Sequence, residues 1–384
     1  MEFTIAYIAG DGAGPEIMDA ALAVLARVGD VFGHEFRPKS CLAGGEAVAT
    51  GHGPLPAESQ AICNAADAVL LGPVQFGTRD DLPPAARPEA MLGLLRRAIG
   101  VQVNLRPIMV WPELAGLSPL CAERIAHGFD LLLVRDLSQG LLGAERGRER
   151  GDAGEVAWDR AHYDERAIRT VAQFAFDAAR GRRCRVASLD KAVVLESSRL
   201  WREVVEQMAT EESDLQVSSF MIDDAAAKLI DDPSRFDVVV TSGMFGDIFA
   251  DEAAALTGAP YLLASAEIAP DGRGIYTPNQ IHATGAFEAG KANPLGLILA
   301  VAQMLRFSFH LPHEAQAVEC AVREAVQAGV RTIDLVTGPS GTPATSAAQG
   351  AAGGDASAGA AKPGGTATTS EMTRAVCERI RLRA

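Results

Sequence analysis

Short apolar runs alternate with helical patterns along most of this chain. The runs FTIAYIAG, FDLLLVRDL, CRVASLD and FDVVVTSG are short and apolar, as buried strands are. Between them, segments such as PEIMDAALAVLARVG and RAIRTVAQFAFDAARGR repeat apolar positions with helical spacing. This alternation predicts an α/β fold with parallel or mixed sheets flanked by helices.

A glycine-rich segment, GDGAGPEI, follows the first predicted strand. The dinucleotide fingerprint requires glycines at the spacing G-x-G-x-x-G, and here the place of the third glycine falls on Pro15. Proline suits the first turn of a helix that follows a glycine-rich turn. The pattern therefore predicts a tight strand-to-helix turn and not a Rossmann fold.

One stretch departs from the globular pattern. Residues 338–370 are almost all Gly, Ala, Ser, Thr and Pro, and they cannot bury enough apolar surface to offset the cost of ordering. We expect a disordered surface insertion here. The final segment, SEMTRAVCERIRLRA, returns to helical periodicity.

Composition narrows the classes of function. The 384 residues carry a formal net charge of -14, which argues against a nucleic-acid or anionic-membrane partner. The cysteines are scattered without a CxxC pair, so neither a zinc site nor a disulfide framework is predicted. No signal-peptide pattern or membrane-spanning apolar run is present, and a cytoplasmic protein is expected.

Two carboxylates, Asp247 and Asp251, stand four residues apart where a predicted strand runs into a helix. This spacing puts both on one helical face, where like charges repel unless a cation lies between them. Asp223 and Asp224 follow another strand-like run. Such oxygen ligands at the carboxyl ends of strands suit Mg²⁺ or Mn²⁺. The alternative is that one aspartate caps the helix and the other faces solvent.

Cationic side chains form a second group. Arg87, Arg96, Arg97 and Arg106 are followed by Arg135, which stands inside an apolar run. A buried guanidinium needs an anion, and this is either a structural Asp or Glu partner or the carboxylates of a small dicarboxylate ligand. Lys191 follows a strand and is a candidate base, unless it is an ordinary solvated lysine.

Together the segments GDGAGPEI, RPEAMLGLLRR, NLRP, VRDL, LDKAVVLE, TSGMFGDIFADEAAALTG, AGKANP and TSEMTRAV resemble the β-decarboxylating dehydrogenases. The resemblance is closest toward isopropylmalate dehydrogenase. It implies a two-domain fold that is not Rossmann, with a first domain from 1–101 and 258–384 and a dimerising second domain from 102–257. It also implies an active site in the cleft between the domains, completed by the partner subunit of a homodimer.

The resemblance assigns roles by motif. Arg96, Arg106 and Arg135 would bind the carboxylates of a hydroxy-dicarboxylate substrate. Asp247 and Asp251 would bind the metal ion, and Lys191 and Asp223 would come from the partner subunit as base and as metal ligand. The residues matched to NAD binding are Glu89, His282, Thr284, Gly285, Ala286 and Asn293. Apolar Met91 and Leu92 favour an alkyl substituent on the substrate, and Gly93 would enlarge that pocket, unless this helix simply packs.

Three positions depart from the family pattern. Leu142 stands where the family has a proton-donating tyrosine, and Tyr163 matches a different family position. Val193 replaces an asparagine that meets the nicotinamide. Phe287 falls where NAD-specific members hold an aspartate, and loss of that acid removes the usual discrimination against NADP. No basic substitute for a 2′-phosphate is evident, so NAD is expected. Leu142 leaves two further hypotheses open: a non-catalytic regulatory paralogue, or oxidation without decarboxylation.

Overall fold

A computed structural model describes residues 1–75, 77, 79–141, 144–279, 287–337 and 366–382. The chain divides into two compact units. Unit 1 contains Met1–Val101, Trp111–Ser118 and Gly258–Ala384, and unit 2 contains Gln102–Val110 and Pro119–Thr257. Residues 111–118 fall in unit 1, whereas the resemblance implies a second domain over 102–257.

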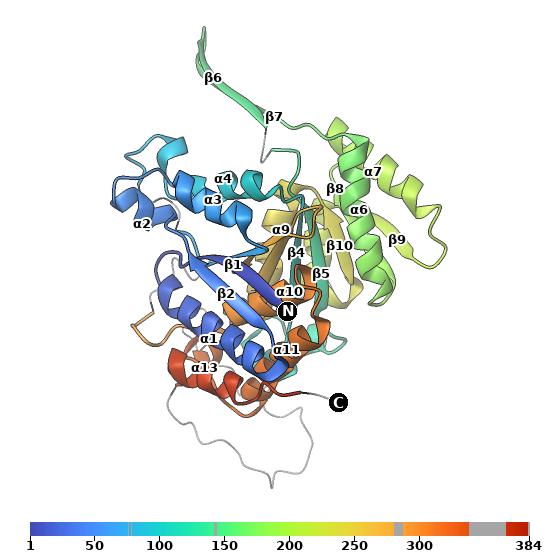
Figure 1. The fold of residues 1–384 in the computed structure, drawn as a ribbon. Helices are drawn as coiled ribbons and strands as arrows, with labels where there is room; N and C mark the ends of the chain where they lie inside the picture. The colour runs from blue at the N-terminus through green and yellow to red at the C-terminus, as the bar shows by residue number, and fades with distance from the viewer. Residues whose placement is uncertain (76, 78, 142–143, 280–286, 338–365, 383–384) are drawn as a thin grey trace. The chain divides into compact units, whose positions relative to one another are not determined.

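Unit 1 is built from helices around a mixed sheet (Figure 1). Its strands are β1 (Glu2–Ile8), β2 (Glu35–Ser40), β3 (Ala68–Leu71), β11 (Ala264–Ile268) and β12 (Gly274–Pro278). Its α-helices are α1 (Gly14–Phe32), α2 (Gly44–Ala49), α3 (Ala57–Ala65), α4 (Ala90–Ile99), α10 (Leu295–Phe307), α11 (Pro312–Gln327), α12 (Asp334–Thr337) and α13 (Thr369–Cys377). Short 3₁₀ turns span Pro84–Ala86, Pro112–Leu117 and Pro260–Leu262.

The strands of unit 1 lie in the order β2-β1-β3-β12-β11, and all neighbours are parallel except β11 and β12. Helix α10 packs on β11 and β12 and is buried along nearly its whole length. The glycine-rich segment forms the predicted turn between β1 and α1. Gly10 and Gly12 have φ of 84° and 57°, and Pro15 lies in the first turn of α1.

The main strands of unit 2 lie in the order β4-β5-β10-β8-β9, in which only the β4–β5 pair is antiparallel. These strands are β4 (Val103–Met109), β5 (Asp130–Asp136), β8 (Arg185–Asp190), β9 (Gln216–Met221) and β10 (Val238–Thr241). The helices are α5 (Ala122–Ile125), α6 (Glu165–Arg180), α7 (Glu196–Ala209), α8 (Ile222–Asp231) and α9 (Gly243–Thr257), with a 3₁₀ turn at Pro233–Arg235.

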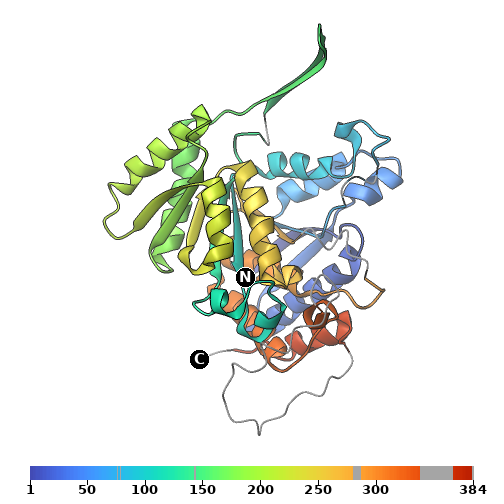
Figure 2. The same ribbon diagram turned by 180° about the vertical axis from the view of Figure 1, so that it is seen from behind.

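Helices cover both faces of the unit 2 sheet. Helices α6 and α7 pack on one face, and α8 and α9 pack on the other, as the two opposite views show (Figures 1 and 2). Because β5, β8 and β10 are parallel, their carboxyl ends meet at one edge of the sheet. Asp136, Asp190 and Thr241 are the last residues of these strands.

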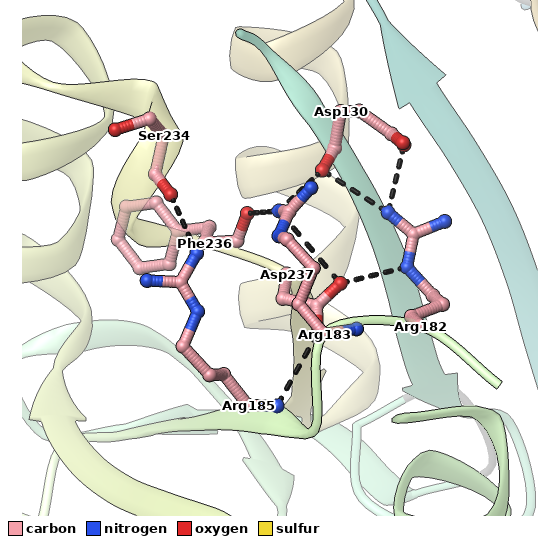
Figure 3. A network of polar contacts seen from close by, with 7 residues as sticks. All are labelled: Asp130, Arg182, Arg183, Arg185, Ser234, Phe236 and Asp237. Atoms are coloured by element: carbon pink, nitrogen blue, oxygen red, sulfur yellow. Dashed lines mark hydrogen bonds and ion pairs between the residues drawn. The ribbon is translucent and has the colours of Figure 1, made fainter. Parts of the chain in front are cut away.

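An arginine network holds the opposite, amino-terminal edge of this sheet (Figure 3). The Arg182 guanidinium donates to Oδ1 of Asp130 at 2.7 Å and to Oδ1 of Asp237 at 2.8 Å. Arg183 and Arg185 donate to the backbone oxygens of Phe236 and Ser234. The starts of β5, β8 and β10 are therefore tied together, which fixes the register of the strands that carry the site residues.

Unit 2 also contains a charged β-hairpin that extends away from its main strands. Among the described strands, β6 (Glu145–Gly151) and β7 (Gly154–Arg160) pair only with each other, and both are exposed along nearly their whole length (Figure 1). Trp158 covers the bare backbone of Gly147, where a Cβ atom would lie 2.7 Å from the indole ring. A pair of strands this exposed is marginal by itself in water.

The predicted α/β fold with mixed sheets flanked by helices is confirmed. The predicted disordered insertion falls mostly on 338–365, which lie outside the described residues. Its last residues are ordered, because Thr368 and Glu371 form a capping box at the start of α13. No helix in the described part of the chain is long and apolar enough to span a membrane.

Candidate functional site

Two aspartates lie on one face of helix α9, directly after the buried strand β10. Asp247 and Asp251 are one turn apart, and their side chains are 54% and 73% exposed. Strand β10 ends at Thr241 and α9 begins at Gly243, so both carboxylates project beside the carboxyl edge of the sheet. Their oxygens are open to a ligand.

Each of these aspartates faces an arginine. The buried Arg135 guanidinium donates through Nη1 to Oδ1 of Asp247, and Nη1 of Arg106 lies 3.4 Å from Oδ1 of Asp251. In the antiparallel β4–β5 pair, Asn104 lies opposite Arg135 and Arg106 lies opposite Leu133. Both arginines therefore point to the same side of the sheet, toward α9. Two cations thus balance the two like charges on the helix.

Gly246 makes the first of these pairs possible. A Cβ atom at this position would lie 2.7 Å from Cγ of Arg135 and 2.9 Å from Cγ2 of Thr241. Because Arg135 and Thr241 are both buried, neither has room to withdraw. The bare backbone of α9 is therefore the surface over which the Arg135 side chain reaches Asp247.

Lys191 and Asp223 form another pair at the same edge of the unit 2 sheet. Lys191 directly follows β8, and Asp223 lies in the first turn of α8, after β9. Asp190 and Met221 are register partners, and Lys191 and Asp223 follow them by one and two residues, where Nζ of Lys191 donates to Oδ1 of Asp223. The neighbouring ammonium lowers the pKa of the Asp223 carboxyl, which is therefore ionised.

The three predicted metal ligands do not form one cluster within the chain. In the described part of the chain, no group of three or more His, Cys, Asp or Glu side chains is placed to hold a metal ion. Asp247 and Asp251 share a helical face, whereas Asp223 lies on another helix beside Lys191. That Asp223 serves the site of a partner subunit stays a prediction.

Arg96 has a structural partner in unit 1. It lies on α4, and its guanidinium forms a two-point contact with Glu267 of β11, with Nε–Oε2 at 2.9 Å and Nη2–Oε1 at 2.5 Å. Arg96 thus forms an ion pair with a structural carboxylate. The role of Arg96 in binding substrate stays a prediction, and any ligand would share this guanidinium with Glu267.

The residues near the start of α4 differ in what they can contact. Met91 is fully buried and packs near Gly44, so it belongs to the core of unit 1. Leu92 is half-buried, and a Cβ atom at Gly93 would approach only Nη1 of Arg97, at 3.5 Å. Oε2 of Glu89 is buried and has no hydrogen-bond partner among the residues that the structure describes. Glu89 therefore presents an acceptor that a ligand could use.

Most of the predicted cofactor loop lies outside the described residues. This applies to His282, Thr284, Gly285 and Ala286, and also to Leu142. Asn293 is described and fully buried, with Nδ2 donating to Asp334 at 2.8 Å and Oδ1 accepting from the backbone of Leu295 at 3.0 Å. Its side chain fixes the start of α10, so a side-chain contact with a cofactor would compete with these bonds.

Tyr163 contacts the first residue of α9. Its hydroxyl lies 3.4 Å from the backbone nitrogen of Gly243, the first residue of α9, and its ring packs edge-on against Trp201. Burial raises the pKa of this phenol to about 12, so it stays protonated. A Cβ atom at Gly140 would lie 2.0 Å from the phenol oxygen. Tyr163 therefore positions the start of the site helix, a role that its sequence position did not reveal.

Comparison with known proteins identifies the family. The family described as isocitrate/isopropylmalate dehydrogenase matches residues 4–349. The chain belongs to this family.

The sequences of its relatives align with this chain over most of their length. The chain is 45% identical over 340 residues to a 3-isopropylmalate dehydrogenase of Oleidesulfovibrio alaskensis, covering 88% of this chain and 94% of the relative. A 3-isopropylmalate dehydrogenase of Geobacillus kaustophilus is 43% identical over 88% of this chain and 91% of its own length. The crystal structure of isocitrate dehydrogenase from Methylococcus capsulatus is similar at a TM-score of 0.79 and 27% identity, and 99% of each chain is covered. This family member is thus an enzyme, a hydroxy-acid dehydrogenase.

Proposed function

We propose that this chain catalyses the oxidative decarboxylation of an alkylmalate-type 2-hydroxy acid in the cytoplasm, with NAD as hydride acceptor and Mg²⁺ or Mn²⁺ as the metal. The observation that carries this proposal is the two neighbouring ion pairs, Arg106 with Asp251 and Arg135 with Asp247. It sets exposed hard-oxygen ligands beside guanidinium groups that suit carboxylates. The names of the relatives support the same reaction class.

The donor set fits a divalent cation of this kind. Asp247 and Asp251 offer carboxylate oxygens on adjacent turns, and Asp223 of the partner subunit would supply a further one. The cation, when bound, supplies positive charge for the oxygen of the new ketone and of the enolate that follows loss of CO₂. Its ligands are hard oxygens without cysteine or histidine, which favours Mg²⁺ or Mn²⁺ over softer metals.

The remaining steps belong to side chains. Arg106 would bind a substrate carboxylate through Nε, which is buried and has no hydrogen-bond partner among the described residues. Arg96 and Arg135 would complete the carboxylate binding. Lys191 pairs with Asp223 in the single chain, and in its neutral form, after loss of its own proton, it would accept the proton of the C2 hydroxyl as hydride leaves for NAD.

The cofactor assignment has support in unit 1. The orphaned buried oxygen Oε2 of Glu89 fits a hydroxyl or amide donor of a dinucleotide. Half-buried Leu92 beside the small residue Gly93, where an added Cβ atom would make only an ordinary contact with Arg97, fits an alkyl substituent on the substrate. NADP is not excluded, because Phe287 stands where NAD-specific members carry an acidic residue.

A homodimer is part of the proposal. Large apolar side chains that are exposed in one chain gather in unit 2, on the segment after β8, on α9 and on β7: Val193, Val194, Leu195, Met244, Ile248, Val156 and Trp158. A second copy of the chain would cover them. It would also bring its Lys191 and Asp223 to the Asp247–Asp251 pair of the first copy.

The test is a panel of alkylmalates, malate, isocitrate and tartrate with NAD⁺ or NADP⁺ and Mn²⁺, followed by mass detection of the products. We expect reduction of NAD⁺ with an alkylmalate and release of CO₂ in equal amount. An Asp247→Asn protein, which lacks a proposed metal ligand, is the inactive control. A wild-type protein that reduces neither cofactor with any of these acids would contradict the proposal.

Leu142 favours a second candidate reaction, oxidation without decarboxylation. Leucine has no proton to give to the enol that follows loss of CO₂. Under this alternative the product panel contains the 2-keto acid without released CO₂. Substituting Leu142→Tyr should raise the CO₂ yield per NADH if decarboxylation is the native reaction and its protonation step is slow. A non-catalytic regulatory paralogue would instead bind the acid without any turnover.

A further inference from the structure

The segment that follows the predicted cofactor loop is held by a carboxylate from the start of the chain. Glu16, in the first turn of α1, accepts hydrogen bonds from two backbone N–H groups of this segment. Oε2 accepts from Gly290 at 2.8 Å, and Oε1 accepts from Ala292 at 3.1 Å. Charge-assisted bonds to two alternate backbone groups fix the path of the chain between them.

A threonine from the other end of the chain closes the contact. Thr369 is buried at the start of α13, and its backbone N–H donates to the carbonyl of Gly290 at 2.9 Å. Its hydroxyl lies within hydrogen-bonding distance of Oε1 of Glu16 and of the carbonyl of Ala292, and it donates to one of them at a time. We call this set of contacts the Glu16–Thr369 clamp.

The clamp sits between the predicted cofactor residues and a rigid helix. Residues 282–286 precede the clamped segment, and Asn293 follows it and anchors the start of α10. Two side chains that are remote in sequence, each fixed on a helix of unit 1, therefore hold the segment that follows the predicted cofactor loop. A plain turn would need neither a carboxylate nor a buried hydroxyl at this point.

We propose that Glu16 and Thr369 are positioning residues for the nucleotide: they hold the 290–292 segment and thereby set the affinity for NAD and NADH. This inference rests on the proposed function for its ligand. Neither residue takes part in the reaction itself. Loosening the clamp adds an ordering cost to nucleotide binding and leaves hydroxy-acid binding and turnover unchanged.

The experiment compares Glu16→Gln, Thr369→Val and Thr369→Ser with the wild-type protein. The glutamine keeps the shape of Glu16 but replaces one acceptor oxygen by an N–H₂ group, and the valine removes only the hydroxyl. Thr369→Ser keeps the hydroxyl and is the conservative rescue. Glu314→Gln is the matched control, since Glu314 is a buried acid in the first turn of another unit 1 helix, paired with His34.

NADH binding is measured by fluorescence titration of the complete protein without substrate, and kcat and KM are measured for NAD⁺ and for the hydroxy acid. We expect the Kd for NADH and the KM for NAD⁺ to rise about tenfold in Glu16→Gln and Thr369→Val, as loss of one or two charge-assisted bonds implies. The kcat and the KM for the hydroxy acid should stay within about twofold, as should all constants of Thr369→Ser and Glu314→Gln.

Two results would overturn the inference. Unchanged Kd for NADH in both clamp variants would show that the contacts serve stability alone, even if the melting temperature falls. A rise shared by Glu314→Gln would show a general effect of weakening unit 1. If Glu16→Gln fails to fold, the pair Thr369→Val and Thr369→Ser decides the matter. A wild-type protein that binds no nucleotide would contradict the proposed function itself. Normal binding by the wild type with unchanged binding by the clamp variants would contradict only the role of the clamp.

Discussion

Gly246 illustrates how one residue without a side chain determines the arrangement of the candidate site. Alanine in a helix is usually favourable over glycine by about 0.5–1 kcal/mol. At this position the added Cβ atom would instead collide with buried Arg135 and Thr241. We therefore predict that Gly246→Ala destabilises the protein by about 1–3 kcal/mol in urea unfolding and lowers the affinity for Mn²⁺.

Gly93 provides the control of opposite sign. It lies inside α4, where a new Cβ atom meets only Nη1 of Arg97 at an ordinary contact distance of 3.5 Å. Gly93→Ala should leave the free energy of unfolding unchanged or raise it by up to about 1 kcal/mol. Equal destabilisation by both substitutions would show that Arg135 does not depend on the bare backbone of α9.

Asp223 and Asp224 are adjacent acids with different expected roles. Asp223 meets Lys191, whereas Asp224 pairs with Lys228 one turn along the same helix. If Asp223 is the metal ligand that the proposed function assigns, Asp223→Asn should lower kcat/KM by about a hundredfold or more, while Asp224→Asn stays within about twofold. Steady-state kinetics at saturating Mn²⁺ checks both, and comparable losses would place the effect in α8 rather than in the site.

Much of the site could be predicted because its elements carry strong local patterns. Lys191 after β8, Asp223 after β9 and the Asp247–Asp251 pair on α9 all follow from strand and helix periodicity. The partner of Arg96 could not be predicted, because Glu267 lies 171 residues away and local pattern carries no information about such a pairing. The hairpin β6–β7 was missed for another reason: both its faces are exposed, so no apolar alternation marks its strands.

Helix α9 is the element that joins metal binding to assembly in the proposed function. One face carries Asp247 and Asp251, and the neighbouring Ile248 is 63% exposed in the single chain. We predict that Ile248→Asp keeps the fold of the chain but shifts a dimer to monomers, because it places a charge in an apolar contact. Light scattering after size-exclusion chromatography measures the mass.

The control for this prediction is an equally exposed apolar side chain far along the chain. Leu382 is 71% exposed and lies beyond α13 in unit 1. Leu382→Asp should leave the mass and the activity unchanged. A monomeric wild-type protein, or an Ile248→Asp protein that remains dimeric, would show that this face of α9 is not the contact.

At the scale of the whole molecule, the acidic balance limits how an anionic substrate can be received. With a net charge of -14, the overall field repels a dicarboxylate, so local guanidinium groups must supply the attraction. In the proposed function Arg106 and Arg135 would provide it, and in the single chain both are paired with aspartates of α9. A bound divalent cation would relieve these arginines of their aspartate partners, which links metal binding to substrate binding in the proposed reaction.

The most direct test of a shared active site uses two inactive variants of the complete chain. Lys191→Met lacks the proposed base, and Asp247→Asn lacks a metal ligand, so each homodimer should be inactive. In a mixed dimer, one site combines the intact Lys191 of one subunit with the intact Asp247 of the other. Random mixing makes half of the dimers mixed, each with one intact site, so activity should return to about 25% of wild type. If Lys191 and Asp247 instead serve the same site from the same chain, every site in the mixture lacks one of them, and activity measured after subunit exchange stays at the level of the separate variants.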